Sequence, residues 1–251
     1  MNYRHIAFSA ALVCSAVIPP LAFAGEPKAV VELFTSQGCS SCPAADKVLG
    51  ELARDPSVLA LSLAVDYWDY LGWKDTLALH GHANRERAYA EARGDREVYT
   101  PQAVIDGVAH VLGSDKAAIE NAIAVARRTA EPLTLPVKIT IDDGKVTVQV
   151  PDSKDEHNNA EVWLCPVTGK VTVTINRGEN NGKTLTYTNV VRRWVKLGDW
   201  DGKAQTFSIA VADLANANVA LKDIDQVSVL VQSGFATKPG VMLGAATASL
   251  H

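Results

Sequence analysis

The chain has 251 residues, of which 47% are hydrophobic and 21% are charged, so it can bury a substantial core as one large or two small domains. Its 24 lysine and arginine residues against 28 aspartate and glutamate residues give a formal net charge of −4. This near balance, without basic clusters, gives no indication of a nucleic-acid partner or of binding to an anionic membrane.

The amino terminus has the pattern of a secretory signal peptide. An Arg4-His5 pair precedes the apolar run 6–18, and Ala22-Phe23-Ala24 supplies a small-residue cleavage site. We therefore assign residues 1–24 to a signal peptide and predict a periplasmic or secreted mature protein. No later segment reaches the roughly 18 apolar residues of a membrane helix, so we expect no membrane span after cleavage.

Three cysteines remain in the mature chain, which export would place in an oxidising compartment. Cys39 and Cys42 enclose only two residues, and a disulfide that closes so short a loop constrains the unfolded chain very little. The pair is therefore better explained by chemistry than by stabilisation. Cys165 lies in a strand pattern beside Trp163 and is expected to be a small buried hydrophobic residue.

The cysteine pair lies between a predicted strand and a predicted helix. The run 29–34 is apolar at almost every position, and a helical apolar spacing begins at Ala44 and ends at Asp55-Pro56. A second apolar strand follows at 58–65. This β-α-β unit predicts the cysteines at the carboxyl end of the first strand, where open α/β sheets place their sites.

A Cys-x-x-Cys at a helix start lets the helix dipole and unpaired N–H groups stabilise a thiolate. We therefore predict Cys39 as the attacking sulfur and Cys42 as the shielded sulfur that resolves a mixed disulfide. A structural disulfide, a metal clasp and two unpaired thiols are the alternatives for the same four residues.

The rest of the chain divides into two regions with different hydrophobic patterns. An aromatic-rich insertion at 66–81 precedes a helix from about His82 to Arg93, an Asp106-Gly107 hairpin and a helix with an apolar stripe over 119–126. After the prolines at 132 and 136 the pattern changes to short alternating strands. We therefore predict domains at 25–132 and 133–251, the second an all-β, sandwich-like domain.

The segment 28–130 resembles the thioredoxin superfamily, which implies an α/β thioredoxin-like fold for the first domain. The resemblance implies that Thr100-Pro101, just before a strand, forms a cis peptide facing the cysteines and contributes to substrate binding. It also implies a buried carboxylate that accepts the proton of the resolving cysteine, a role for which Glu32 is the candidate; a paired or edge carboxylate is the alternative.

The chain departs from typical thioredoxin because it lacks Trp-Cys-Gly-Pro-Cys, inserts the aromatic loop and adds a β domain. It is more similar to a family of secreted thioredoxin-like proteins known only as a domain of unknown function. The segments 32–43, 66–73, 99–102 and 176–180 carry that resemblance, which implies fold and export but no substrate.

The leading hypothesis is an exported thiol-disulfide oxidoreductase that acts on protein or small-molecule thiols and disulfides without a cofactor. A second hypothesis is a copper or zinc binding or delivery protein, in which His80 and His82 would join the two thiolates. A third is a non-catalytic binding module carried by the β domain. The sequence indicates neither the direction of electron transfer nor the oligomeric state.

Overall fold

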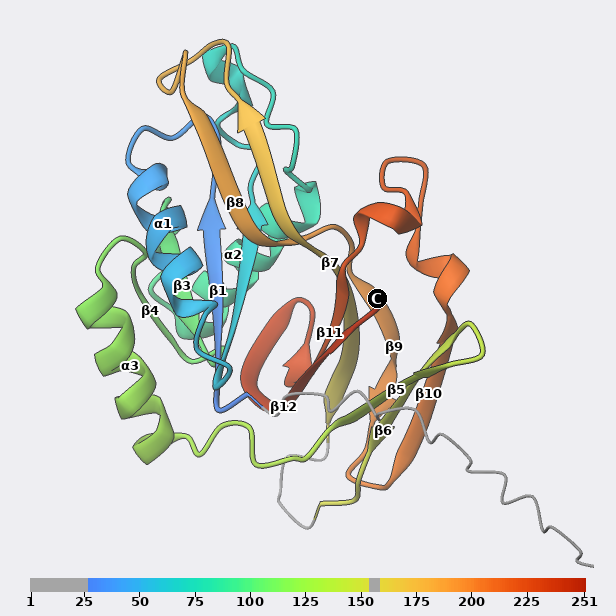
Figure 1. The fold of residues 1–251 in the computed structure, drawn as a ribbon. Helices are drawn as coiled ribbons and strands as arrows, with labels where there is room; N and C mark the ends of the chain where they lie inside the picture. Colours follow the sequence, from blue (N-terminus) through green and yellow to red (C-terminus); the bar gives the residue numbers. More distant parts are fainter. Residues whose placement is uncertain (1–26, 154–158) are drawn as a thin grey trace, which may run out of the picture.

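The computed structural model describes residues 27–153 and 159–251 (Figure 1). The predicted signal peptide, residues 1–24, lies outside the described residues. In chain order the elements are β1 (Ala29–Thr35), α1 (Cys42–Leu52), β2 (Val58–Ala64), η1 (Asp69–Leu71), α2 (His80–Arg93), β3 (Gln102–Ile105), β4 (Ala109–Leu112), α3 (Lys116–Thr129), β5 (Lys138–Asp142), β6 (Lys145–Val150), β7 (Ala160–Thr174), β8 (Thr184–Val191), β9 (Val195–Trp200), β10 (Gln205–Ala210), η2 (Val211–Leu214), η3 (Leu221–Asp223), β11 (Gln226–Phe235) and β12 (Lys238–Ser249).

A nine-stranded mixed sheet runs through the molecule in the order β12-β11-β7-β8-β2-β1-β3-β4, with β9 also paired to β7. A separate three-stranded sheet has the order β10-β6-β5. The predicted β-α-β unit is present, because β1 and β2 pair in parallel and α1 connects them. The predicted hairpin is present as well, with Asp106 and Gly107 both at positive φ in its turn.

The predicted fold class, an α/β thioredoxin-like domain followed by an all-β sandwich-like domain, is wrong. Strands dominate the described residues, which contain three α-helices, and the large sheet combines strands from both parts of the chain. The junction is a parallel contact between β2 and β8, where Ser62 pairs with Val190. Alternating sequence patterns identify strands but not their partners, and here the partners are more than 120 residues apart in the chain.

The long strand β7 explains much of this difference. The sequence predicted two strands, 161–165 and 170–175, where the structure has one continuous strand of 15 residues. Its first half pairs with β11 and β9, and its second half pairs with β8. One strand therefore belongs to both regions of the fold, and Figure 1 shows β7 and β8 rising beside β1 and α1.

The two faces of β1 bury different side chains. Val31 and Leu33 pack with residues of α1 and α3, whereas Val30 and Phe34 pack on the opposite face with Tyr89 of α2. On α1 the buried positions follow helical spacing and form the stripe that faces the sheet. These positions are Cys42, Ala45, Asp46, Leu49 and Leu52.

A buried polar network ties β1, α2 and β11 together. Arg85 of α2 donates from Nε to Glu32 Oε1 at 2.6 Å and from Nη2 to Gln232 Oε1 at 2.8 Å. The hydroxyl of Tyr89 donates to Glu32 Oε2. Glu32 is 0% exposed and Arg85 is 8% exposed, so the charges are compensated inside the protein.

Replacing Arg85 with Met is expected to lower the free energy of unfolding by about 3–5 kcal/mol, because Glu32 would keep a buried charge without its partner. Urea unfolding near neutral pH measures the loss. The double variant Glu32→Gln/Arg85→Met should recover most of it, since the uncompensated carboxylate is gone. A double variant at least as unstable as the single variant would contradict this account.

Candidate functional site

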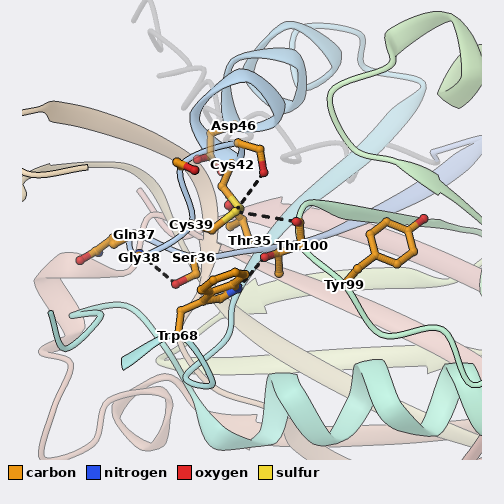
Figure 2. The surroundings of a disulfide bond; sticks show 12 residues. Thr35, Ser36, Gln37, Gly38, Cys39, Cys42, Asp46, Trp68, Tyr99 and Thr100 are labelled. Atoms are coloured by element: carbon orange, nitrogen blue, oxygen red, sulfur yellow. Dashed lines mark hydrogen bonds between the residues drawn. A yellow bond between two sulfur atoms is a disulfide. The ribbon is translucent and has the colours of Figure 1, made fainter. Parts of the chain in front are cut away.

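The cysteine pair lies between the end of β1 and the start of α1, as predicted, and forms a disulfide with a Cα–Cα distance of 5.4 Å (Figure 2). Cys42 is the first residue of α1, and Pro43 occupies the first turn, where a missing N–H costs least. Ser41 is the N-cap residue but makes no side-chain capping bond.

Both sulfur-bearing residues are buried in the disulfide state, Cys39 at 2% exposure and Cys42 at 0%. The intervening Ser40 and Ser41 are exposed, so the disulfide lies closest to solvent on the side of these two serines. Cys39 Sγ lies 3.4 Å from Ser41 Oγ and 3.8 Å from the carbonyl oxygen of Thr100. The relative reactivity of the two thiols after reduction stays a prediction.

The structure brings the Thr100-Pro101 segment to the cysteines. The peptide between these residues is cis, as predicted. The Thr100 side chain is held by Trp68, whose Nε1 donates to Thr100 Oγ1 at 2.7 Å. The predicted site residues Cys39, Cys42, Thr100 and Pro101 are therefore assembled in one place, although they come from two separate segments.

Glu32 is not part of this group, and the alternative of a paired carboxylate is the one observed. In β1 it occupies the face opposite α1, where its carboxylate is held by Arg85 and Tyr89. Side chains two residues apart share a strand face, and an odd spacing changes the face. Glu32 therefore packs with Phe34 beside α2, whereas Leu33 and Thr35 face the helix that carries Cys42.

The carboxyl group near the pair belongs to Asp46, which the sequence analysis missed. It follows Cys42 by four residues on α1, so the two side chains share one helix face (Figure 2). Thr35 Oγ1 donates to Asp46 Oδ1 at 2.8 Å, and Oδ2 has no hydrogen-bond partner among the described residues. An aspartate at an apolar-stripe position was the signal that could have found it.

Burial raises the pKa of Asp46 to about 8, against the lowering effect of the Thr35 hydrogen bond, and the nearby Asp75 carboxyl raises it further. The side chain is 5% exposed. A carboxyl group with this pKa gains or loses a proton in the range where thiols also titrate.

A loop between β7 and β8 reaches the cysteine segment from the far part of the chain. Asn180 is fully buried and donates from Nδ2 to the carbonyl oxygens of Gln37 at 3.0 Å and Cys39 at 2.8 Å. Its neighbour Glu179 accepts the backbone N–H of Ser40 at 3.0 Å. The sequence analysis singled out 176–180 as a motif without locating it, and the structure places its last residues against the pair.

The aromatic insertion packs against the other side of the cysteine loop. Trp73 Nε1 donates to Gln37 Oε1 at 2.8 Å, and Asp75 Oδ2 accepts the N–H of Gln37 at 2.8 Å. A Cβ atom added to Gly38 would lie 3.0 Å from Trp68 Cβ, so a larger residue here would require Trp68 to shift. The insertion therefore shapes the loop that presents Cys39.

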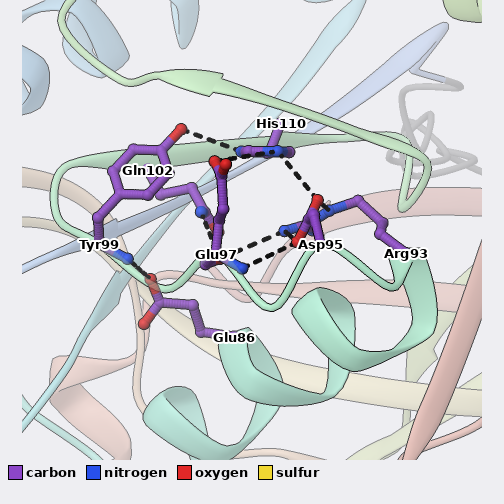
Figure 3. Close-up of polar contacts among 7 residues, drawn as sticks. All are labelled: Glu86, Arg93, Asp95, Glu97, Tyr99, Gln102 and His110. Carbon is purple, nitrogen blue, oxygen red and sulfur yellow. Dashed lines mark hydrogen bonds and ion pairs between the residues drawn. The ribbon is translucent and has the colours of Figure 1, made fainter.

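A second set of polar contacts fixes the segment that leads into Thr100 (Figure 3). The Tyr99 hydroxyl lies 3.0 Å from His110 Nδ1, and His110 Nε2 lies 3.2 Å from Asp95 Oδ2. The hydrogen bond from Arg93 holds the pKa of Asp95 down at about 2. The N–H of Tyr99 donates to Glu86 Oε1 at 3.2 Å, which joins the segment to α2.

The histidines considered as metal ligands have other partners. His80 Nδ1 lies 2.9 Å from Asp66 Oδ2, and the buried His82 Nδ1 lies 2.8 Å from the carbonyl oxygen of Ala64. Burial lowers the pKa of His82 to about 4. Within residues 27–153 and 159–251, no three His, Cys, Asp or Glu side chains gather as metal ligands. Cys165 is buried and has no disulfide partner; it packs in an apolar cluster as expected, and the buried Arg85 and Glu32 also lie near it.

The described part of the chain contains no helix with the length and apolar character needed to cross a membrane. That finding and the disulfide are compatible with an extracellular location.

The family described as Protein of unknown function (DUF1223) matches residues 30–232, so the chain belongs to this family. The chain is similar to the crystal structure of protein AGR_C_4864 from Agrobacterium tumefaciens, with 33% identity, a TM-score of 0.77 and coverage of 89% of this chain and 94% of that chain. It shares the fold of HBP35 of Porphyromonas gingivalis at 13% identity, with a TM-score of 0.62 and coverage of 90% and 76%. No curated protein matches the sequence. The family match confirms the predicted domain of unknown function and does not support membership of the thioredoxin superfamily.

Asp46→Asn is expected to make the protein more stable than wild type above pH 8 and to leave stability unchanged below pH 4. A pKa raised from 3.8 to about 8 means that folding favours the protonated form, so wild type loses stability as pH rises through this range. The full shift corresponds to about 6 kcal/mol. Denaturant unfolding of both proteins from pH 4 to 9 measures it, and parallel curves would contradict the assignment.

Proposed function

We propose that this DUF1223 protein is a thiol-disulfide oxidoreductase that works in the periplasm or after secretion, with Cys39 and Cys42 as its redox pair. The observation that carries the proposal is the position of the disulfide. It closes a loop of two residues at the end of β1, beside the exposed Ser40 and Ser41 and 3.8 Å from the Thr100 carbonyl. A bond placed only for stability would join more distant segments.

The reaction uses the two sulfurs in sequence. In the reducing direction the Cys39 thiolate attacks one sulfur of a substrate disulfide, forms a mixed disulfide and releases the other substrate sulfur as a thiolate. Cys42 then loses its proton and attacks Cys39 Sγ. The substrate leaves as a second thiolate, two electrons pass to it, and the Cys39–Cys42 disulfide forms. The oxidising direction is the same sequence reversed.

Asp46 is the group placed to handle the proton of Cys42. The two residues are one helical turn apart, the side chain is buried, and Oδ2 has no hydrogen-bond partner among the described residues. Its pKa of about 8 suits proton exchange with a thiol near neutral pH, because proton transfer is most effective between groups of similar pKa. This assigns to Asp46 the role that the sequence analysis gave to Glu32.

Thr100, which is half-buried, lies beside Cys39 where a substrate would contact it, and the buried cis Pro101 supports it from below the surface. The hydrogen bond from Trp68 and the contacts of Tyr99 hold this segment in place before any substrate arrives. A preorganised wall beside the attacking sulfur orients the incoming disulfide and lowers the entropic cost of the reaction.

Cys42→Ser should accumulate a stable mixed disulfide with a disulfide-bonded peptide, because the attacking sulfur remains and the resolving sulfur is gone. Cys39→Ser should form none and lose turnover. Mass spectrometry of the acid-quenched adduct identifies the sulfur involved. Cys165→Ala is the matched control, since that thiol is buried away from the pair, and it should react like wild type. An adduct on Cys42 in the Cys39→Ser protein, together with no adduct on Cys39 in the Cys42→Ser protein, would reverse the assignment.

Asp46→Asn should slow the resolution of that mixed disulfide at pH 7 by on the order of 10²-fold, the usual contribution of a positioned acid or base. Formation of the adduct by Cys39 should change much less. Rapid-quench kinetics from pH 6 to 9 separate the two steps. Equal slowing of both steps would point to a structural role for Asp46.

A further inference from the structure

The backbone donors around Cys39 are bonded to groups of the protein itself. Ser40 N donates to Glu179 Oε2 at 3.0 Å, Cys42 N donates to the Cys39 carbonyl at 3.2 Å, and Cys39 N donates to Ser36 O at 3.2 Å. Thiolates at helix starts are ordinarily stabilised by N–H groups that have no other partner. In the disulfide form these three donors are therefore already occupied, contrary to the sequence-based expectation.

One of the two contacts of Cys39 Sγ seen in the disulfide form would favour a thiol over a thiolate after reduction. The carbonyl oxygen of Thr100, at 3.8 Å, can accept a hydrogen bond from S–H but has no proton to donate to S⁻. Ser41 Oγ, at 3.4 Å, is the neighbour that can donate. Among the described residues these are the two hydrogen-bond contacts of the sulfur.

The charged groups bonded directly to the cysteine segment are carboxyl groups, whereas the cation Lys183 bonds from Nζ to Asn180 Oδ1 at 2.9 Å. Three carboxyl groups bond to the segment 35–40, and no lysine, arginine or histidine of the described residues forms a hydrogen bond or ion pair with residues 35–42. A nearby negative charge disfavours a second one on sulfur, and Asp46 adds little to this effect at pH 7 because its pKa of about 8 leaves it mostly protonated. The carboxyl groups are Asp46 on Thr35 Oγ1, Asp75 on Gln37 N and Glu179 on Ser40 N.

From these contacts we infer that the pair works as a reductant of disulfide substrates, and that Glu179 is a positioning residue that sets this direction. The inference rests on the proposed oxidoreductase function. A dithiol pair becomes a strong oxidant when its reduced form is stabilised. Here the contacts do not stabilise the reduced form of the pair. The two thiols therefore give two electrons to a substrate disulfide and become the Cys39–Cys42 disulfide. A second protein with a dithiol must then reduce the Cys39–Cys42 disulfide again, and its own dithiol is oxidised to a disulfide in that exchange.

Equilibration of the wild-type chain with glutathione and with dithiothreitol tests the direction, with thiol trapping by mass to count the two states. We expect glutathione buffers to leave the disulfide intact and dithiothreitol to reduce it. Half-reduction in buffers that contain mostly oxidised glutathione would show a strong oxidant and overturn the inference. A pair that exchanges with neither reagent would instead overturn the proposed function itself.

Glu179→Gln tests the residue. The amide oxygen can still accept the N–H of Ser40, so the variant removes the charge and keeps the geometry. We expect the equilibrium constant to shift about threefold toward the reduced form, equivalent to about 14 mV for a two-electron couple. Added salt should diminish the shift, because Glu179 is exposed. The midpoint of the Cys39 alkylation rate against pH should fall in the same variant.

Glu120→Gln is the matched control, because it removes the same charge from the exposed surface of α3. It should leave the equilibrium and the alkylation midpoint unchanged. Glu179→Ala, which also releases the Ser40 N–H, should shift the equilibrium further than Glu179→Gln. Equal values for wild type and both Glu179 variants, with normal exchange, would remove the role of Glu179 while leaving the redox pair in place.

Discussion

The site depends on one constraint, which is that the buried carbonyl groups of the cysteine loop need hydrogen-bond donors. Asn180 supplies them, because its single side-chain nitrogen bonds to both Gln37 O and Cys39 O from a loop about 140 residues away. Buried carbonyls left unbonded cost free energy comparable to a lost hydrogen bond, so the Asn180 contact stabilises the loop together with the bonds from Trp73 and to Asp75. The strand pairing of β7 with β8 and of β8 with β2 is what delivers Asn180 to this position.

The same strand pairing determines which charged groups lie beside the Cys39–Cys42 disulfide. A Cys-x-x-Cys at a helix start would, by itself, favour an acidic first thiol. In this protein the connection between β7 and β8 also brings Glu179 to the Ser40 N–H, and the aromatic insertion brings Asp75 to the Gln37 N–H. Carboxyl groups thus occupy these donors, and the same connection carries the cation Lys183, which bonds to Asn180 Oδ1 and not to the cysteine loop. The chemistry of the pair is set by its neighbours in space more than by its own four residues.

The buried carboxyl groups illustrate why a correct type of residue can be predicted at the wrong position. Glu32 was a reasonable candidate because it lies in a buried strand shortly before the cysteines. The alternation of strand faces, however, points Glu32 toward Arg85 and Tyr89. There its carboxylate belongs to the hydrogen-bond network that connects β1, α2 and β11. Asp46 reaches the correct face because helical spacing repeats at four residues from Cys42. Its role was hidden by an apolar stripe in which one polar residue is easily overlooked.

The sequence by itself determined the elements that depend on local spacing. These include the β-α-β unit with the cysteines at its first junction and the Asp106-Gly107 hairpin. The cis peptide before Pro101 was implied by the family resemblance and not by spacing. Only the tertiary structure decided that β8 lies beside β2 and that Asn180 and Glu179 bond to the backbone of the cysteine loop. It also decided that Glu32 pairs with Arg85, outside the site. The reason is physical. Local patterns fix which backbone conformation a segment adopts and which face it buries, whereas the partner of a strand or a loop is chosen by packing between segments far apart in the chain.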